Sequence, residues 1–173
     1  MATLAETYNK IKLPIRIMFQ DEAGFGGMST PKSCWSPFSY RPMVNLAIVR
    51  EFRYIYASIC PSTGRLYYMA SDKMNAKKMN RHLRQVSQRM RGKFVIMIVD
   101  GASSHRSKDL KIPKNIHFIH LPPYSPELDP TEQIWRMLRA DYFGNREFKS
   151  LEEAIFQAKL GLNVLFSNKS SII

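Results

Sequence analysis

The sequence predicts one α/β domain built on a mixed β-sheet. Three observations predict it: two early strands joined by a short turn, an amphipathic basic helix, and two further strands that follow this helix. A hairpin followed by helix-separated strands is typical of a mixed sheet that carries helices on both faces. With 173 residues and 45% hydrophobic content, the chain is long enough for one core.

The strands are predicted from short apolar or β-branched runs bounded by turn residues. A first strand spans residues 15–20, and the glycine-rich segment 24–27 after it reads as a flexible turn. Residues 28–42, rich in Ser, Pro and aromatic residues, are expected to form a loop or an irregular arm. The remaining strands are expected at 43–49, at 53–60 and 65–70 as an antiparallel hairpin, and at 94–99 and 116–120.

The helices are predicted from apolar side chains at helical spacing. The first spans residues 73–90, with Met79, Leu83, Val86 and Met90 on one face. A Pro-rich loop, 121–130, leads into a helix over 131–142. A last helix begins near Ser150, which forms a capping box with Glu153. Its apolar stripe is Ile155, Ala158, Leu162 and Leu165.

The net charge of +12 and the pI near 9.9 point to a polyanionic partner, nucleic acid first. The segment 73–93 holds eight Lys or Arg residues and no acidic residue. Its helix is therefore a candidate for binding phosphates, and a solvated basic face over a core stripe is the alternative. The candidate DNA contacts on it are Lys77, Lys78, Arg81 and Arg84.

The two cysteines and the apolar runs indicate the compartment. Cys34 and Cys60 lack metal-type spacing and form no disulfide framework, which fits a reduced intracellular compartment. The longest wholly apolar run, 94–99, is too short to span a bilayer, and the N-terminus has no signal pattern. The sequence predicts a cytoplasmic protein without a membrane partner.

Three carboxylates are candidates for metal chemistry. Asp21 and Asp100 each follow a predicted strand, and Glu132 lies in the first turn of a helix. If the two strands are adjacent and parallel, the two Asp side chains can face one another. Clustered carboxylates repel one another unless hard cations lie between them, and Mg²⁺ prefers oxygen ligands. Two such ions about 4 Å apart would suit phosphoryl transfer.

Each carboxylate also has a purely structural interpretation. Asp21 could lie at a solvated strand end, and Asp100 with Gly101 could form a plain turn. Glu132 could belong to a capping box in which Asp129 is the N-cap residue. Spacing alone does not decide between these interpretations and a metal site.

Three segments resemble the mariner-like DDE transposases, and above all their bacterial insertion-sequence branch. They read FQDEAGF at 19–25, VDGASSH at 99–105 and LPPYSPELDPTEQIW at 121–135. The third segment is long and specific. The resemblance runs from about residue 15 to residue 142 and more weakly to the end. The family usually has Asn where Gly101 and Asp129 stand, so Asp129 adds a carboxylate next to Glu132.

The resemblance implies a ribonuclease H-like fold, a mixed sheet of about five strands flanked by helices. It implies that Asp21, Asp100 and Glu132 are the catalytic residues and the ligands of two Mg²⁺ or Mn²⁺ ions. In the family, water attacks a phosphodiester at the element end, and the freed 3′-hydroxyl then attacks target DNA. The expected activity is metal-dependent DNA cleavage and strand transfer, in the bacterial cytoplasm next to the nucleoid.

The expected partners are DNA and further copies of the chain assembled on it. Residues 1–173 are expected to form a single catalytic domain, with 1–14 as an N-terminal extension and without the family's helix-turn-helix region. Two other functions stay open: a decayed or repurposed fragment that only binds nucleic acid, and a ribonuclease H-like nuclease that does not join strands.

Four further residues are candidate nucleic-acid contacts, and three of them have an alternative. His105 could contact phosphate or orient a metal-bound water, or it could simply bond to backbone at a helix start. Tyr124 on the Pro-rich loop could touch DNA. Arg136 and Arg139 share a face with Glu132, so they could hold phosphates or pair with that carboxylate. Trp135 is expected to be a core residue.

Overall fold

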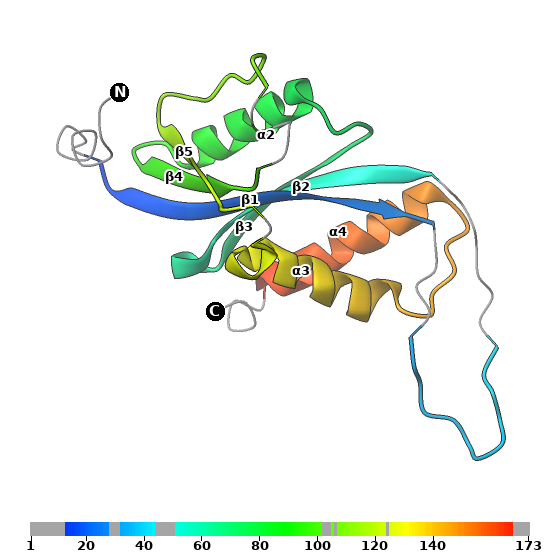
Figure 1. The fold of residues 1–173 in the computed structure, drawn as a ribbon. Coiled ribbons are helices and arrows are strands. Elements are labelled where there is room, and N and C mark those ends of the chain that lie inside the picture. The colour runs from blue at the N-terminus through cyan, green and yellow to red at the C-terminus, as the bar shows by residue number, and fades with distance from the viewer. Residues whose placement is uncertain are drawn as a thin grey trace.

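The structure is a computed structural model that describes residues 13–27, 32–43, 51–101, 105, 107–123 and 125–167. The described residues form a five-stranded sheet in the order β3-β2-β1-β4-β5, with α2 on one face and α3 and α4 on the other (Figure 1). This arrangement confirms the predicted mixed sheet with helices on both faces.

The elements have the following bounds. The strands are β1 (Ile15–Gly26), β2 (Phe52–Cys60), β3 (Arg65–Ser71), β4 (Phe94–Val99) and β5 (Ile116–His120). The helices are α2 (Ala76–Arg89), α3 (Pro130–Leu138) and α4 (Leu151–Ser167). Short 3-10 turns, η1 (Pro61–Thr63) and η3 (Pro126–Leu128), and a π-helical turn, η4 (Arg139–Phe143), complete the list.

Strand β1 lies at the centre of the sheet. It pairs antiparallel with β2, which pairs antiparallel with β3, as the predicted hairpin requires. On its other side β1 pairs parallel with β4, and β4 pairs parallel with β5. Because parallel strands end at the same edge of the sheet, the ends of β1 and β4 come together there.

The first strand is longer than the sequence predicts, and the turn expected at 24–27 is wrong. The antiparallel pairing with β2 continues to the pair Gly26–Phe52 and provides hydrogen-bond partners for the backbone of β1 along this length. A Cβ atom on Gly26 would lie 2.3 Å from the carbonyl oxygen of Glu51. The glycine therefore permits a close approach of two backbones, which local sequence cannot distinguish from a turn.

Helix boundaries also differ from the predicted ones. Helix α2 begins at Ala76 rather than at residue 73, because the Asn75 side chain caps it by accepting from the Lys78 amide. The predicted helix over 131–142 is α-helical only to Leu138 and then becomes the π-helical turn η4. Before α4, Ser150 Oγ accepts from the Glu153 amide at 3.2 Å, as the capping box predicts.

Two apolar clusters form the core, one on each face of the sheet. On one face, α2 buries its predicted stripe against alternate residues of β1, β2 and β4. On the other face, α3 and the predicted stripe of α4 cover β1 and β2. Helix α4 lies close to α3 at Gly161, where a Cβ would come within 2.4 Å of Leu138 Cδ1.

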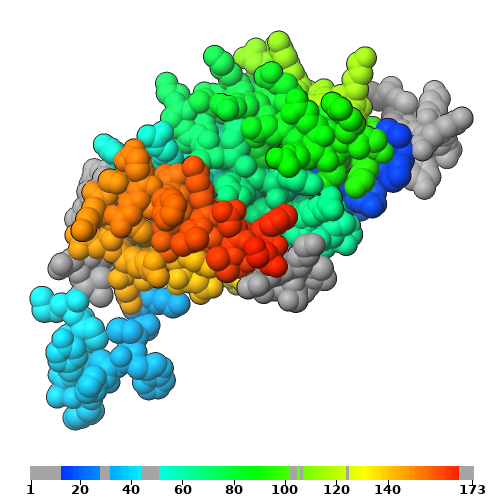
Figure 2. Space-filling model, turned by 180° about the vertical axis from the view of Figure 1, so that it is seen from behind, coloured from blue at the N-terminus to red at the C-terminus, as the bar shows by residue number. Residues whose placement is uncertain are grey.

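Residues 32–43 form an arm without helix or strand that projects from the body (Figure 2). Trp35 and Phe38 on it are fully exposed. The start of the arm is anchored by two hydrogen bonds: the Lys32 amide donates to Asn145 Oδ1 at 2.7 Å, and Asn145 Nδ2 donates to the Lys32 carbonyl at 2.8 Å. The strand predicted at 43–49 falls almost wholly outside the described residues, as do residues 28–31 of the expected loop.

None of the described helices is both long enough and apolar enough to cross a bilayer.

A buried histidine makes the stability of this fold depend on pH. His82 of α2 is almost fully buried, and its Nε2 lies 2.8 Å from the Ser58 hydroxyl. Burial lowers the pKa of His82 from 6.5 to about 3. Between pH 6.5 and about pH 3, His82 is therefore protonated in the unfolded chain but neutral in the folded chain. The free energy of unfolding falls as the pH drops through this range.

Replacing His82 with Gln is expected to remove this dependence while keeping a hydrogen-bonding side chain. Between pH 7 and pH 5 the wild type is expected to lose about 2 kcal/mol more unfolding free energy than His82→Gln, from about 1.4 kcal/mol per pH unit below 6.5. Urea unfolding at both pH values measures the difference, and the other titrating groups cancel in the comparison. Parallel pH profiles would show that His82 is protonated inside the fold.

Candidate functional site

One cleft brings the three candidate carboxylates together at the edge of the sheet where β1 and β4 end their parallel pairing. Asp21, Asp100 and Glu132 all line it, together with Asp129. Gly101, Leu121 and residues of the Pro-rich loop complete the wall. Strand β1, which carries Asp21, and strand β4, which Asp100 follows, are adjacent and parallel, the arrangement in which the sequence predicts that the two Asp side chains can face one another.

Asp21 lies inside β1, opposite Ala57 of β2, and not beyond the end of the strand as predicted. The parallel pairing with β4 stops one residue earlier, at Gln20 and Val99. Asp21 is thus the first residue of β1 without β4 beside it. Side chains alternate along a strand, so Asp21 faces α3 while Glu22 faces the opposite side of the sheet.

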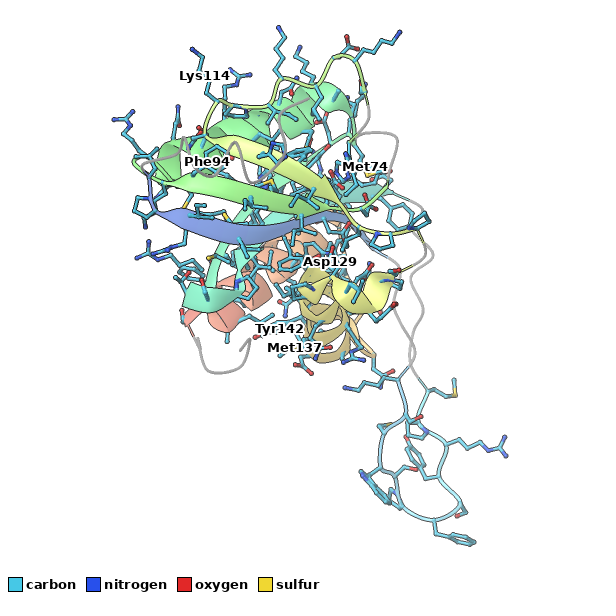
Figure 3. All side chains as sticks on the ribbon, turned by 60° about the vertical axis from the view of Figure 1, so that its left-hand side comes forward. Met74, Phe94, Lys114, Asp129, Met137 and Tyr142 are labelled. Carbon is cyan, nitrogen blue, oxygen red and sulfur yellow. The ribbon has the colours of Figure 1, made fainter. Side chains whose placement is uncertain are left out.

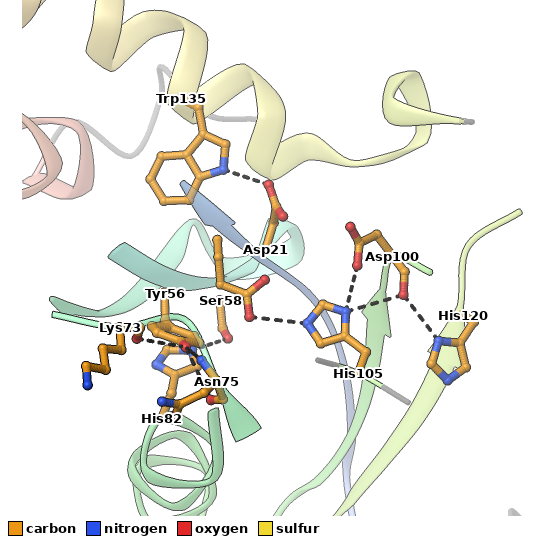
Figure 4. Close-up of polar contacts among 11 residues, drawn as sticks. Asp21, Tyr56, Ser58, Lys73, Asn75, His82, Asp100, His105, His120 and Trp135 are labelled. Carbon is orange, nitrogen blue, oxygen red and sulfur yellow. Dashed lines mark hydrogen bonds and ion pairs between the residues drawn. The ribbon is translucent and has the colours of Figure 1, made fainter. Parts of the chain in front are cut away.

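The indole of Trp135 holds the Asp21 carboxylate. Trp135 is almost completely buried in the core, as the sequence predicts, and its Nε1 donates to Asp21 Oδ2 at 2.8 Å (Figure 4). Burial raises the pKa of Asp21 from 3.8 to about 7, although the Trp135 hydrogen bond lowers it. A nearby positive charge would favour the ionised form and relieve this cost.

Asp100 follows β4 directly and contacts a buried histidine (Figure 4). His105 Nδ1 lies 2.6 Å from Asp100 Oδ1, and His105 Nε2 lies 3.3 Å from Glu22 Oε1. The His105 side chain is 0% exposed and that of Glu22 is 3% exposed, whereas the Asp100 side chain is 47% exposed. Burial lowers the pKa of His105, but the Glu22 hydrogen bond and the charges of Glu22 and Asp100 outweigh it and raise the pKa to about 9.

Asp129 and Glu132 both belong to the start of α3. Asp129 is the N-cap residue, as predicted, and its Oδ1 accepts from the Thr131 amide at 2.9 Å and from the Thr131 hydroxyl at 2.6 Å. Burial raises the pKa of Asp129. Glu132, one turn into the helix, is exposed and reaches the cleft from the α3 side.

The donor set of the cleft fits hard divalent cations. The titratable side chains that the structure describes in its wall are carboxylates, and burial raises the pKa of Asp21 and of Asp129. Oxygen-only donors with carboxylate charge suit Mg²⁺ and Mn²⁺. In the described part of the chain, no three such side chains lie close enough together to form a ready-made metal site.

The structure does not place His105 where a DNA contact would need it, because its side chain is fully buried and both ring nitrogens face carboxylates. Tyr124 lies outside the described residues. Arg136 and Arg139 are exposed and line a second hollow that shares Asp129 and Glu132 with the cleft. Arg136 bonds to Gln133, and Arg139 lies 5.4 Å from the centroid of the Phe25 ring.

The basic face of α2 is accessible. Lys77, Arg81 and Arg84 are exposed, and Lys78 pairs with Asp72 at 2.5 Å. The β4–β5 connection lies against this helix, where Asn80 Nδ2 donates to the Asp109 carbonyl and Asn80 Oδ1 accepts from the Lys111 amide. Exposed lysines on the connection extend the basic surface, and Figure 3 labels one of them, Lys114. They are Lys108, Lys111 and Lys114.

Two contacts at the candidate site are not predicted by the sequence. Glu22 is the partner of His105, and Trp135, expected in the core, is also the partner of Asp21. Glu22 lies 83 residues from His105 in the sequence, and Trp135 lies 114 residues from Asp21. The available signal was the alternation along β1, which places consecutive acidic residues on opposite faces of the sheet.

The contact between Trp135 and Asp21 can be measured as a coupling free energy. In metal-free buffer at pH 8.5, a double-mutant cycle of Trp135→Phe and Asp21→Ala is expected to give a coupling of about 2 kcal/mol, as for hydrogen bonds to charged groups. The cycle cancels the packing lost with the indole. Urea unfolding of the four proteins measures it, and additive effects would contradict the contact.

Comparisons with known proteins identify the family of the chain. Residues 16–155 match a family described as DDE superfamily endonuclease. A protein of Sinorhizobium fredii named "Uncharacterized protein y4pE/y4sA" is 32% identical over 103 residues, covering 59% of this chain and 76% of that protein.

Among solved structures, the Mos1 strand transfer complex matches 98% of this chain with a TM-score of 0.61 at 16% identity. The Mos1 mariner paired end complex with Mn matches 88% of it with a TM-score of 0.62 at 20% identity. A simian T-cell lymphotropic virus intasome matches 87% with a TM-score of 0.54 at 14% identity. These likenesses show a ribonuclease H-like fold. The chain spans 57% and 48% of the length of the two Mos1 chains.

Proposed function

The chain belongs to the DDE superfamily of endonucleases, and from this premise we propose that it is the catalytic domain of a metal-dependent transposase that cleaves DNA and transfers the cut strand. One observation carries the proposal: Asp21, Asp100 and Glu132, from β1, the end of β4 and α3, line a single cleft. The resemblance to the mariner-like transposases implies the same three residues as the DDE triad.

Two Mg²⁺ or Mn²⁺ ions would be held by the carboxylates of Asp21, Asp100 and Glu132. Asp129 would be an additional ligand, since it lines the same cleft and its helix-cap hydrogen bonds are made by Oδ1. When bound, such ions supply charge stabilisation of the phosphate oxygens and make water a better nucleophile. Structures of Mos1 with Mn and with Mg support this assignment by their similar fold.

The chain's own residues prepare the cleft for an in-line displacement. The Trp135 N–H and the His105 ring each hold one carboxylate oxygen of a proposed ligand, so that Asp21 and Asp100 enter the reaction already oriented. A water oxygen attacks phosphorus, the bond from phosphorus to the 3′ oxygen breaks, and the 3′ oxygen takes up a proton. The freed 3′-hydroxyl then attacks a second phosphodiester in the same way.

Basic residues on two surfaces are proposed to hold the DNA. Arg136 and Arg139 adjoin the cleft and would hold phosphates near the scissile bond. Lys77, Lys78, Arg81 and Arg84 on α2 would hold a neighbouring stretch of backbone. Tyr124 stays a predicted contact on the Pro-rich loop. Support comes from the net charge of +12, which a fold of this size does not itself require.

The functional unit is proposed to be several copies of the chain assembled on DNA. The Mos1 relatives were solved as a strand transfer complex and as a paired-end complex with the left transposon end. A single cleft would act on one phosphodiester at a time, so cutting both ends of an element would require more than one copy.

Two assays distinguish this proposal from its alternatives. A supercoiled plasmid nicked with Mg²⁺ or Mn²⁺, but not with a chelator, is the expected result for an enzyme, whereas a binding fragment would leave the plasmid intact. Joining of a pre-cut 3′-hydroxyl end to a second duplex is expected for a transposase. Nicking without joining would instead support a ribonuclease H-like nuclease.

A further inference from the structure

A buried acidic residue and a buried histidine lie directly behind the cleft, on the opposite face of the sheet from Trp135. Glu22 follows Asp21 in β1 and therefore points to the other side of the sheet. Its side chain is only 3% exposed, and it faces a His105 side chain with no exposure at all. Burying an unpaired carboxylate costs several kcal/mol, and the contact with His105 offsets this cost for Glu22.

The histidine connects this carboxylate to one of the proposed metal ligands. One ring nitrogen lies 3.3 Å from Glu22 Oε1, and the other lies 2.6 Å from Asp100 Oδ1. The same Nδ1 lies 3.3 Å from the Asp100 carbonyl oxygen, and His120 Nδ1 lies 3.2 Å from that carbonyl. Contacts to both the main chain and the side chain of Asp100 restrict its rotation at the end of β4.

We infer that Glu22 is a positioning residue: through the buried ring of His105 it fixes the Asp100 carboxylate in the orientation that faces the cleft. This inference rests on the proposed metal site. The His105 ring contacts Asp100 Oδ1 from the buried side, while the half-exposed side chain of Asp100 lines the cleft. Glu22 fixes the ring in turn, because it meets the nitrogen that Asp100 does not use.

The arrangement also links the two proposed Asp ligands. Asp21 and Glu22 are consecutive in β1, and Asp100 and His105 both follow β4. The Glu22–His105 contact therefore connects the two strands just beyond their last parallel pair, Gln20 and Val99. A fixed separation between the strand ends fixes the separation of the two carboxylates. Carboxylates that orient a metal ligand through a second group typically change metal affinity by about 10- to 100-fold when removed.

The test measures Mn²⁺ binding by the chain without DNA, using the electron paramagnetic resonance signal of free Mn²⁺. Glu22→Ala is expected to weaken Mn²⁺ binding by about 10- to 100-fold. Glu22→Gln keeps an oxygen acceptor for the ring and is expected to lie between Glu22→Ala and the wild type. Glu152→Gln is the matched control, because Glu152 pairs with Arg53 at the surface and its side chain is 74% exposed. It is expected to bind Mn²⁺ like the wild type.

A second comparison separates positioning from a general structural effect. If Glu22 acts through Asp100, Glu22→Ala is expected to cause no further loss of Mn²⁺ affinity in an Asp100→Ala background. At saturating Mn²⁺, Glu22→Gln is expected to nick DNA at most of the wild-type rate. The Mn²⁺ concentration that nicking requires therefore changes more than the maximal nicking rate. Urea unfolding of each variant checks that it is folded.

Three results would overturn the inference. Wild-type Mn²⁺ affinity in Glu22→Ala would remove it and leave the proposed function intact. An equal loss of affinity in the presence and absence of the Asp100 side chain would show that Glu22 acts elsewhere. Absence of Mn²⁺ binding by the wild type would overturn the proposed metal site itself, and the inference with it.

Discussion

Asp100→Asn, Asp21→Asn and Glu132→Gln are each expected to lower metal-dependent nicking by about a thousandfold or more. An amide keeps the shape of the side chain but loses the charge that binds a cation, and that charge supports several kcal/mol of stabilisation in the transition state. Nicking of a supercoiled plasmid in Mg²⁺, followed over time, measures the loss. Near wild-type nicking by Asp100→Asn would show that the carboxylate assignment is wrong.

Controls separate lost chemistry from lost folding. Glu127→Gln makes the same chemical change in the hollow next to the cleft and is expected to leave nicking unchanged. The raised pKa of Asp21, about 7, means that its buried carboxylate is ionised at pH 8 at a cost to the metal-free fold. The stability contributed by the protonated form is lost as pH rises through 7, so metal-free Asp21→Asn at pH 8 is expected to be at least as stable as the wild type.

Removing three exposed basic residues of α2 is expected to weaken DNA binding at least tenfold and equally for every duplex. The variant is Lys77→Ala, Arg81→Ala and Arg84→Ala combined, with Lys78 left in place because it pairs with Asp72. Contacts to phosphate release counterions and carry no sequence information. The slope of log affinity against log salt is therefore expected to flatten by about 2 to 3.

The matched control removes the same charge from another surface. Arg146, Lys149 and Lys159 are exposed on and just before α4, and their combined replacement with Ala is expected to leave affinity and salt slope closer to those of the wild type. Titrations of related and unrelated labelled duplexes at several salt concentrations measure both quantities. An unchanged slope in the α2 variant, or a loss confined to one duplex, would exclude this surface as the phosphate contact.

The sequence alone determined the features that depend on neighbours along the chain. The stripe of Met79, Leu83 and Val86 identified α2, because side chains three and four residues apart share a helix face. Turn residues between two runs rich in aromatic and aliphatic side chains identified the β2–β3 hairpin. Asp100 was correctly placed after β4 because a buried apolar strand must end where polar residues begin.

Only the tertiary structure decided the features that depend on distant partners. Local signals ended β1 near Gln20, but pairing with β2 carries it to Gly26 and places Asp21 inside the strand. The contacts of Asp21 with Trp135 and of Glu22 with His105 leave no local signal, since 114 and 83 residues separate the partners. Periodicity reports which side chains share a face of one element. Which elements face each other depends on burial and backbone pairing between segments far apart in the chain. This tertiary arrangement makes Asp21 a candidate metal ligand and places its neighbour Glu22 against His105 on the other face of the sheet.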